Sequence, residues 1–238
     1  MKIPSLVKLR SRVVVLSLTC ILSAAQNYAS GAISVKDSQL ERAQSKYTVF
    51  IPDTFKLLDV VEGDLNKDGV KDVVLMVKST DARQWVTDGY SGKIDRNRRG
   101  IIILIQKNGS DQKLIQNLSI FSSENEDGGV YFAPVLSLKI EKNLLHVHYD
   151  HGRYGSRDYR FRLQNHDFQM IGYDELSAHW SFIYSKTSIN FLTGQKVFQQ
   201  NNNPDEENNP QFIESWKKFQ HVPISLSQIK DIDRLKMP

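Results

Sequence analysis

The feature that most constrains the fold is an alternation of apolar and polar residues through the second half of the chain. Apolar side chains recur at every second position over residues 136–140, 145–149 and 159–163. This period is that of a β-strand with one buried face and one solvated face, which is common in antiparallel sheets. Turn residues such as Thr193-Gly194 separate the runs. The sequence therefore predicts a meander of half-exposed antiparallel strands.

The first half of the chain carries a different β signal. Residues 73–77 and 101–105 are apolar at every position, which is typical of short strands buried on both faces. The polar stretch from 85 to 99 contains two glycines and predicts a long loop. No boundary divides residues 47–238, so we expect one mostly-β domain. Its antiparallel meander sheets are expected to be propeller-blade-like or sandwich-like, with a few short helices.

The N-terminal residues have the organisation of an export signal. Residues 1–25 combine a basic start, an apolar run and a small-residue end, which is typical of a secretory signal peptide. The apolar run is shorter than the ~18 residues that span a bilayer. We expect cleavage before Gln26, a periplasmic or secreted product, and no membrane span in the mature chain. Residues 26–46 are polar with weak helical spacing and are expected to form a linker or a short helix.

The charge and the cysteine content both change when that segment is removed. The whole chain has a net charge of +4, but four of its 31 basic residues lie in the expected signal, and the remainder balance the 27 acidic residues. The basic balance therefore gives no argument for nucleic-acid binding. The single cysteine, Cys20, also lies in the signal, and its neighbours Leu18 and Thr19 do not fit a lipid-attachment motif. We expect no disulfide and no cysteine metal site in the mature chain.

One motif has chemical content, the segment Gly-Asp-Leu-Asn-Lys-Asp-Gly-Val-Lys-Asp at residues 63–72. Ca²⁺ takes six to eight oxygen ligands, and side-chain oxygens recur at alternate positions of this segment. Gly69 permits a sharp turn, and water would complete the coordination. The motif predicts one structural Ca²⁺ with ligands from Asp64, Asn66, Asp68, the backbone carbonyl of Val70, and Asp72.

The motif is not an EF-hand, because its twelfth position is Leu75 where an EF-hand has a bidentate glutamate. Its flanks look like strands, so we expect a hairpin over residues 57–77. The loop resembles the calcium loop of FG-GAP and VCBS repeats, which lies in a hairpin of a propeller blade. That resemblance implies the same five ligands, although the sequence holds no second copy. The order of features also resembles a group of exported bacterial proteins with no assigned activity, through residues 125–129, 161–165 and 171–173.

Two further groups of residues have alternative interpretations. His146 and His148 are two positions apart and could hold zinc with a remote carboxylate. They alternate with apolar residues, so solvent-facing histidines are the favoured interpretation. The alternating aromatic residues Trp180, Phe182 and Tyr184 are predicted to lie in the core rather than to form a carbohydrate platform.

These features favour an exported accessory or binding protein of the bacterial envelope, with one structural calcium site and no catalysis. The expected partner is an envelope protein or a glycan. One alternative is a periplasmic inhibitor or immunity protein. A second alternative is a metal-dependent hydrolase that uses His146 and His148.

Overall fold

The computed structural model describes residues 37–89, 92–124, 133–203 and 209–238. The expected signal peptide, its cleavage site and Cys20 lie outside these residues. The chain divides into two units, Met1–Arg42 and Ala43–Pro238. A helix covers residues 37–47. Within the described ranges, no helix is long and apolar enough to cross a membrane.

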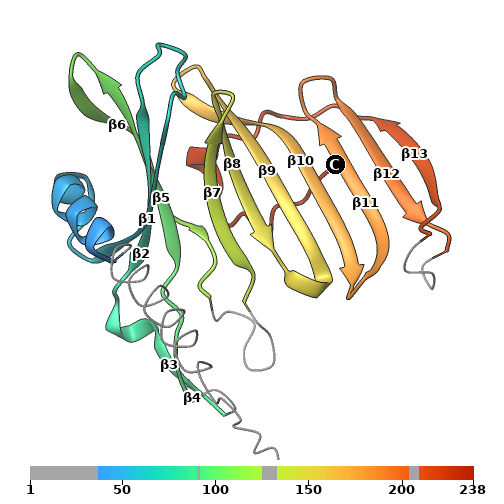
Figure 1. Cartoon of the computed structure of the whole chain (residues 1–238), viewed down its shortest axis with the longest axis horizontal. Coiled ribbons are helices and arrows are strands. Elements are labelled where there is room, and N and C mark those ends of the chain that lie inside the picture. The colour runs from blue at the N-terminus through green and yellow to red at the C-terminus, as the bar shows by residue number, and fades with distance from the viewer. Residues whose placement is uncertain (1–36, 90–91, 125–132, 204–208) are drawn as a thin grey trace, which may run out of the picture. The chain divides into compact units, whose positions relative to one another are not determined.

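The first sheet has four antiparallel strands in the order β1-β2-β5-β6 (Figure 1). Their bounds are Phe55–Gly63 for β1, Asp72–Ser79 for β2, Arg99–Lys107 for β5 and Ser110–Phe121 for β6. The two central strands, β2 and β5, are buried over almost their whole length. This burial on both faces confirms the interpretation of the two continuous apolar runs.

The second sheet has seven antiparallel strands whose order follows the chain. They are β7 (Val135–Glu141), β8 (Leu144–Asp150), β9 (Gly155–Gln164), β10 (Asp167–His179), β11 (Phe182–Asn190), β12 (Gln195–Asn201) and β13 (Phe212–Lys218). Short 3₁₀ turns are η1 (Thr48–Phe50), η2 (Ala82–Gln84), η3 (Gly152–Tyr154) and η4 (Leu226–Gln228). The predicted meander and the mostly-β antiparallel fold are confirmed.

The long loop predicted over residues 85–99 is wrong. This stretch contains a small hairpin of β3 (Trp85–Asp88) and β4 (Gly92–Asp95), and β5 already begins at Arg99. The hairpin pairs with neither main sheet. Of its apolar residues only Ile94 is buried, whereas Trp85 is exposed. A strand that buries so few residues has too little alternation for its sequence to distinguish it from a loop.

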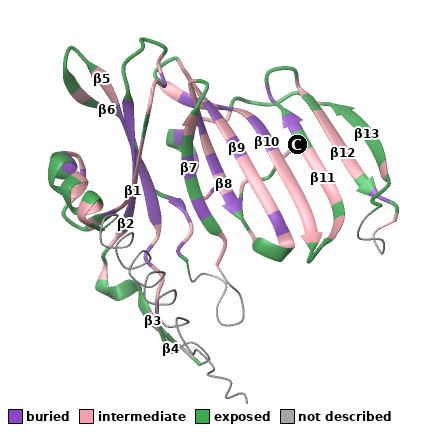
Figure 2. Cartoon of the chain, viewed as in Figure 1, coloured by how far each residue is buried: buried purple, intermediate pink, exposed green. Residues whose placement is uncertain are grey.

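The two sheets pack face to face through one apolar core. Inward-facing residues of β2, β5 and β6 join those of β7 through β11 in a single cluster (Figure 2). On β9, for example, Tyr159 and Phe161 point into this core while Arg160 and Arg162 point outward. This arrangement is sandwich-like rather than propeller-like, because two sheets share one interior.

The other face of the four-stranded sheet is also apolar and buried. Leu57 pairs with Val77, and Leu75 pairs with Ile102, and these residues are at most 4% exposed. The backbone N–H of Leu57 donates a 2.6 Å hydrogen bond to Oε1 of Gln44. The end of the preceding helix is thereby fastened to the edge strand of this sheet.

The C-terminal segment joins the two sheets. The N–H of Met170 donates to the carbonyl of Ile224, and the N–H of Ile232 donates to the carbonyl of Ile120. The Asn117 amide on β6 donates 2.9 Å and 2.7 Å bonds to the carbonyls of Leu226 and Ile229. Asn117 is only 9% exposed, so its two bonds satisfy carbonyl groups that have little access to water.

Asn117→Ala should therefore destabilise the protein by about 1–3 kcal/mol, because it leaves buried carbonyl groups without a donor. Gln116→Ala is the matched control, since Gln116 is the exposed neighbour on the same strand, and surface changes usually stay within ~0.5 kcal/mol. Urea unfolding of both variants measures the difference. Equal unfolding midpoints would show that these two bonds contribute nothing to the attachment of the C-terminal segment.

Candidate functional site

The predicted calcium ligands lie together on the connection between β1 and β2. These strands pair antiparallel, with Gly63 opposite Asp72, so residues 64–71 form the tip of a hairpin. At this tip, Lys67 and Gly69 both have positive φ angles of 68° and 82°. Glycine adopts such a conformation without strain, and the two residues together curl the chain back on itself.

Side-chain oxygens accept hydrogen bonds from the loop's own backbone. Asp64 accepts from the N–H groups of Lys67 and Gly69, at 2.6 Å and 3.1 Å. Asn66 Oδ1 accepts from Asp68 N–H, and Asp68 Oδ1 accepts from Val70 N–H. The Asn66 amide also donates to Asp68 Oδ2 at 2.8 Å. These bonds keep the side chains of Asp64, Asn66 and Asp68 folded against the same short turn.

Asp72 differs from the other predicted ligands because it is fully buried. Its Oδ2 accepts from Leu65 N–H at 2.8 Å, and its Oδ1 accepts from Gln106 N–H at 3.0 Å. Burial raises the pKa of this carboxyl above its usual range, although the two backbone bonds act in the opposite direction. Asp72 therefore ties the loop to β5 of the same sheet.

The loop is also held from outside its own hairpin. The Asn143 side chain, in the turn between β7 and β8, donates a 2.8 Å bond to the carbonyl of Asp64. At the base of the hairpin, a Cβ placed on Gly63 would lie 2.6 Å from Cγ2 of Ile140. The start of the calcium motif thus rests against the edge of the seven-stranded sheet.

The acidic side chains of the motif lie in two places, the exposed turn and the interior. Among the residues that the structure describes, no group of three or more His, Cys, Asp or Glu side chains is arranged to hold a metal ion. Asp64 and Asp68 share the exposed turn with Asn66, while the carboxylate of Asp72 lies in the interior.

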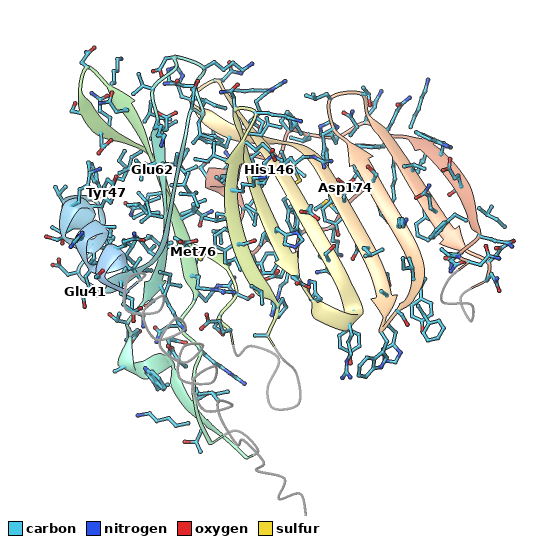
Figure 3. All side chains as sticks on the ribbon, viewed as in Figure 1. Glu41, Tyr47, Glu62, Met76, His146 and Asp174 are labelled. Carbon is cyan, nitrogen blue, oxygen red and sulfur yellow. The ribbon has the colours of Figure 1, made fainter. Side chains whose placement is uncertain are left out.

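The two histidines of the alternative zinc site point away from the core, as the alternation predicts. His146 and His148 lie on β8 between buried neighbours. Figure 3 labels His146 on this strand. His148 Nδ1 lies 2.7 Å from Asp158 Oδ1 on the neighbouring strand, with both side chains more than one-third exposed. His148 thus has one carboxylate beside it, which is the arrangement of a surface pair.

Strands β9 to β12 form a shallow depression of about 340 Å³ on this outer face. Its polar character comes from cross-strand neighbours, since Asp158 is opposite Asp174 and Asp174 is opposite Ser188. Lys186 and Gln199 also line it. Arg160 binds Asp174, His148 binds Asp158 and Arg157 binds Glu175, so all three carboxylates that line the depression have a partner.

The prediction that Trp180, Phe182 and Tyr184 lie in the core is wrong. Trp180 is 64% exposed and Tyr184 is 40% exposed, whereas Phe182 is half-buried. A register shift after Ser177 interrupts the regular pairing of β10 with β11. Alternation identifies a shared face, but it does not show whether a neighbouring sheet covers that face.

Around Trp180 the structure shows a cluster of aromatic and basic side chains that the sequence analysis missed. The Arg153 guanidinium lies over the rings of both Trp180 and Tyr154, with its carbon 4.7 Å and 5.0 Å from their centroids. Tyr154 stacks on His179 at 5.7 Å. We call Arg153, Tyr154, His179 and Trp180 the Trp180 cluster. The glycine-punctuated basic segment at 151–157, next to an aromatic turn, is the sequence signal that could have indicated it.

The backbone at Trp180 is strained. Its φ angle is 59°, a region that is unfavourable for a bulky residue. The N–H of Trp180 donates a 2.8 Å bond to the carbonyl of Arg153, which fixes this conformation. One position thus combines backbone strain with an exposed indole, and backbone strain of this kind clusters at functional sites.

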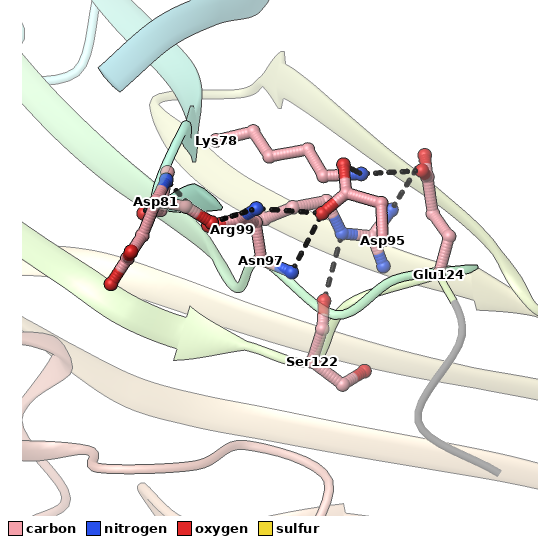
Figure 4. A network of polar contacts seen from close by, with 8 residues as sticks. Lys78, Asp81, Asp95, Asn97, Arg99, Ser122 and Glu124 are labelled. Atoms are coloured by element: carbon pink, nitrogen blue, oxygen red, sulfur yellow. Dashed lines mark hydrogen bonds and ion pairs between the residues drawn. The ribbon is translucent and has the colours of Figure 1, made fainter. Parts of the chain in front are cut away.

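A buried ionic network lies at one end of the four-stranded sheet (Figure 4). Lys78 and Arg99 are cross-strand neighbours, and each side chain is at most 6% exposed. Lys78 Nζ lies 3.1 Å from Asp95 and 3.0 Å from Glu124, and Glu124 also lies 3.7 Å from Arg99. Burial raises the pKa of Asp95, but bonds from Asn97 and Lys78 outweigh it and leave the pKa below its usual range. The carboxylates neutralise two cations that would otherwise repel.

Comparisons with known proteins give no relative. No family model matches the chain, and no curated protein or solved structure matches it.

We expect the stability to fall as the pH is lowered from about 7 to about 5. Burial lowers the pKa of His146 and of His151 below the usual value. At pH values between the histidine pKa of the folded state and that of the unfolded state, the unfolded chain binds more protons than the folded chain. The free energy of unfolding therefore rises with pH and decreases on acidification. Charged groups facing His151 include Arg157, Asp233 and Glu175.

Urea unfolding at several pH values tests this expectation. A double variant, His146→Gln with His151→Gln, should show a flatter dependence over this interval than the parent. His166→Asn is the control, since His166 is exposed and has a φ angle of 66° that asparagine tolerates. A double variant with the parent's full slope would assign the effect to other groups.

Proposed function

We propose that this chain is an exported accessory protein of the bacterial envelope that binds a partner protein without catalysis. The observation that carries the proposal is the Trp180 cluster. Trp, Tyr and Arg are the residue types that dominate the binding energy of protein interfaces. Here all three types lie together on the surface, and strained backbone holds the tryptophan there. The export signal at residues 1–25 supports the envelope location.

The donor arrangement of the cluster favours a protein partner. The Arg153 guanidinium stacks against the rings of Tyr154 and Trp180. Its N–H groups lie in the guanidinium plane and can donate hydrogen bonds to a partner. The Trp180 ring supplies apolar area with few rotatable bonds. A carboxylate or a backbone carbonyl beside an apolar side chain would match this surface. A periplasmic inhibitor or immunity protein would use such a surface equally well.

We further propose that the β1–β2 loop binds one structural Ca²⁺. The donor set supports this, because Asp64, Asn66 and Asp68 present only oxygen and amide groups on one exposed turn, and Ca²⁺ takes oxygen ligands. Each carboxylate oxygen that accepts a backbone N–H retains a further lone pair. The Val70 carbonyl and water would add ligands. The likeness to FG-GAP loops implies Asp72 as a fifth ligand, and its bond to Leu65 N–H also holds the loop in place from beneath.

Calcium should raise the melting temperature modestly. Extracellular calcium modules bind with a Kd on the order of 10⁻⁴ to 10⁻³ M. At ~1 mM Ca²⁺ and a Kd of ~10⁻⁴ M, binding adds about 1.4 kcal/mol to the free energy of unfolding. For a domain of this size the expected shift is about 3–6 °C. Thermal melting in EGTA and in excess Ca²⁺ measures it, and identical curves would refute the calcium proposal.

A variant separates the ligand role of the loop from its structural role. Asp68→Asn keeps an oxygen that can accept from Val70 N–H but removes the charge, so it should lose most of the calcium shift while it melts like the parent in EGTA. Asp53→Asn is the matched control, because Asp53 is exposed and lies outside the loop. An undiminished calcium shift in Asp68→Asn would place the ion elsewhere.

Site-specific photo-crosslinking tests the binding surface. Benzoylphenylalanine in place of Trp180 should give a covalent adduct with an envelope protein in intact cells. The same probe in place of Trp85 is the control, because Trp85 is also exposed and has Lys93 over its ring at 5.3 Å. Equal labelling at both positions, or no protein adduct at residue 180, would contradict a protein-binding role for the cluster.

A further inference from the structure

The last strand of the seven-stranded sheet has an edge with no partner among the described residues. β13 pairs with β12 in an unbroken register from Phe212 to Lys218 and ends the strand order. Six of its seven residues are exposed, including Ile213 at 61% and Trp216 at 67%. Such an edge presents free N–H and C=O groups to another strand.

The direction of those backbone groups follows from two hydrogen bonds. The carbonyl of Gln211 accepts from Asn202 N–H, and the N–H of Phe219 donates to the carbonyl of Gly194, so both residues point their groups toward the preceding strand. In an antiparallel pair this direction alternates from residue to residue. Odd-numbered residues from 211 to 219 therefore face β12. Glu214, Trp216 and Lys218 direct their N–H and C=O groups to the open edge.

From this placement we propose that β13 pairs with β13 of a second copy of this chain, antiparallel and centred on Trp216. Two-fold symmetry makes each contact occur twice. With the axis at Trp216, Glu214 of one copy lies opposite Lys218 of the other, and the two indoles face each other. Every one of these residues has outward backbone groups, so all three pairs are hydrogen-bonded pairs.

Charge selects this register over its neighbours. An axis at Ser215 places Glu214 opposite Trp216 and leaves Lys217 opposite Ile213, with no ion pair. An axis at Lys217 places two lysines directly opposite each other, which is unfavourable. Only the register centred on Trp216 forms two Glu–Lys pairs and one aromatic pair, each of which stabilises adjoining strands.

The side chains on this face are already arranged for the contact. Gln199 donates to Glu214 Oε1 at 2.6 Å, and Trp216 Nε1 donates to Glu214 Oε2 at 3.3 Å. Glu214 is thus held on the same face as Trp216 and Lys218. The opposite edge strand, β7, lies near β1 through Ile140 and Gly63, so its surroundings differ from those of β13. The contact is independent of the Trp180 cluster and of the calcium loop.

A charge-exchange experiment tests the pairing. Sedimentation of the purified protein over a concentration series should show a monomer–dimer equilibrium. Glu214→Lys alone and Lys218→Glu alone should each weaken the dimer about tenfold, because two attractive pairs become repulsive. An equimolar mixture of the two variants should regain dimer as a heterodimer, in which both pairs are again opposite in charge. Lys56→Glu, at an exposed position of β1, is the control and should dimerise like the parent.

Two results would overturn the proposal. The first is a parent protein that sediments as a monomer throughout the series. The second is a mixture of the two variants that associates no better than either variant alone. Circular dichroism of each variant confirms that the sheet remains folded, so that a loss of dimer reports on the edge rather than on unfolding.

Discussion

The apolar inner face of the seven-stranded sheet is the constraint on which the rest of the structure depends. A single antiparallel sheet with one apolar face must cover that face with another layer. The four-stranded sheet supplies most of the cover, and the C-terminal segment adds Leu226, Ile229 and Ile232 to the same cluster. How many strands of the larger sheet this second layer reaches determines which of their residues are buried in the core and which are exposed.

The covering layer does not extend over the last two strands of the larger sheet, β12 and β13. The buried cluster includes Ile189 of β11 but no residue of β12 or β13. On the core-facing side, apolar residues beyond this limit are exposed, as Ile213 is at 61%. Val197 and Trp216 lie in register with Ser188 on the outer face of the sheet. The exposure of Ile213 therefore results from a difference in width between the two layers, whereas Trp216 is exposed because it lies on the uncovered outer face. Surfaces available to partners are found where a wider sheet extends past a narrower one.

Sequence alone predicted the parts of the fold that depend on local periodicity. The faces of β8 and β9 follow directly from alternation, because each residue on a strand points opposite to its neighbours. The continuous apolar runs identified β2 and β5 as central strands. Neither result needed knowledge of which strands pair.

The failures have a common physical origin, since each depends on contacts that are distant in sequence. Trp180 and Tyr184 have the spacing of core residues, yet no layer covers them at the end of β10 and β11. The β3–β4 hairpin buries too little to leave a periodic signal. In the calcium motif, spacing placed Asp64, Asn66 and Asp68 on one turn, but it did not show that Asp72 would be buried against Gln106.

Asp72 links the exposed loop to the interior. Its carboxylate bonds Leu65 on the loop side and Gln106 on the sheet side, while Leu65 itself inserts into the core cluster. The tip of the hairpin is thus anchored by one polar contact and one apolar contact, whatever occupies the turn above it. Since this anchor uses only groups of the protein, we expect the sheet to form without an ion. A cation at the turn would order only the exposed side chains. For that reason calcium can add stability to this fold without being a condition for it.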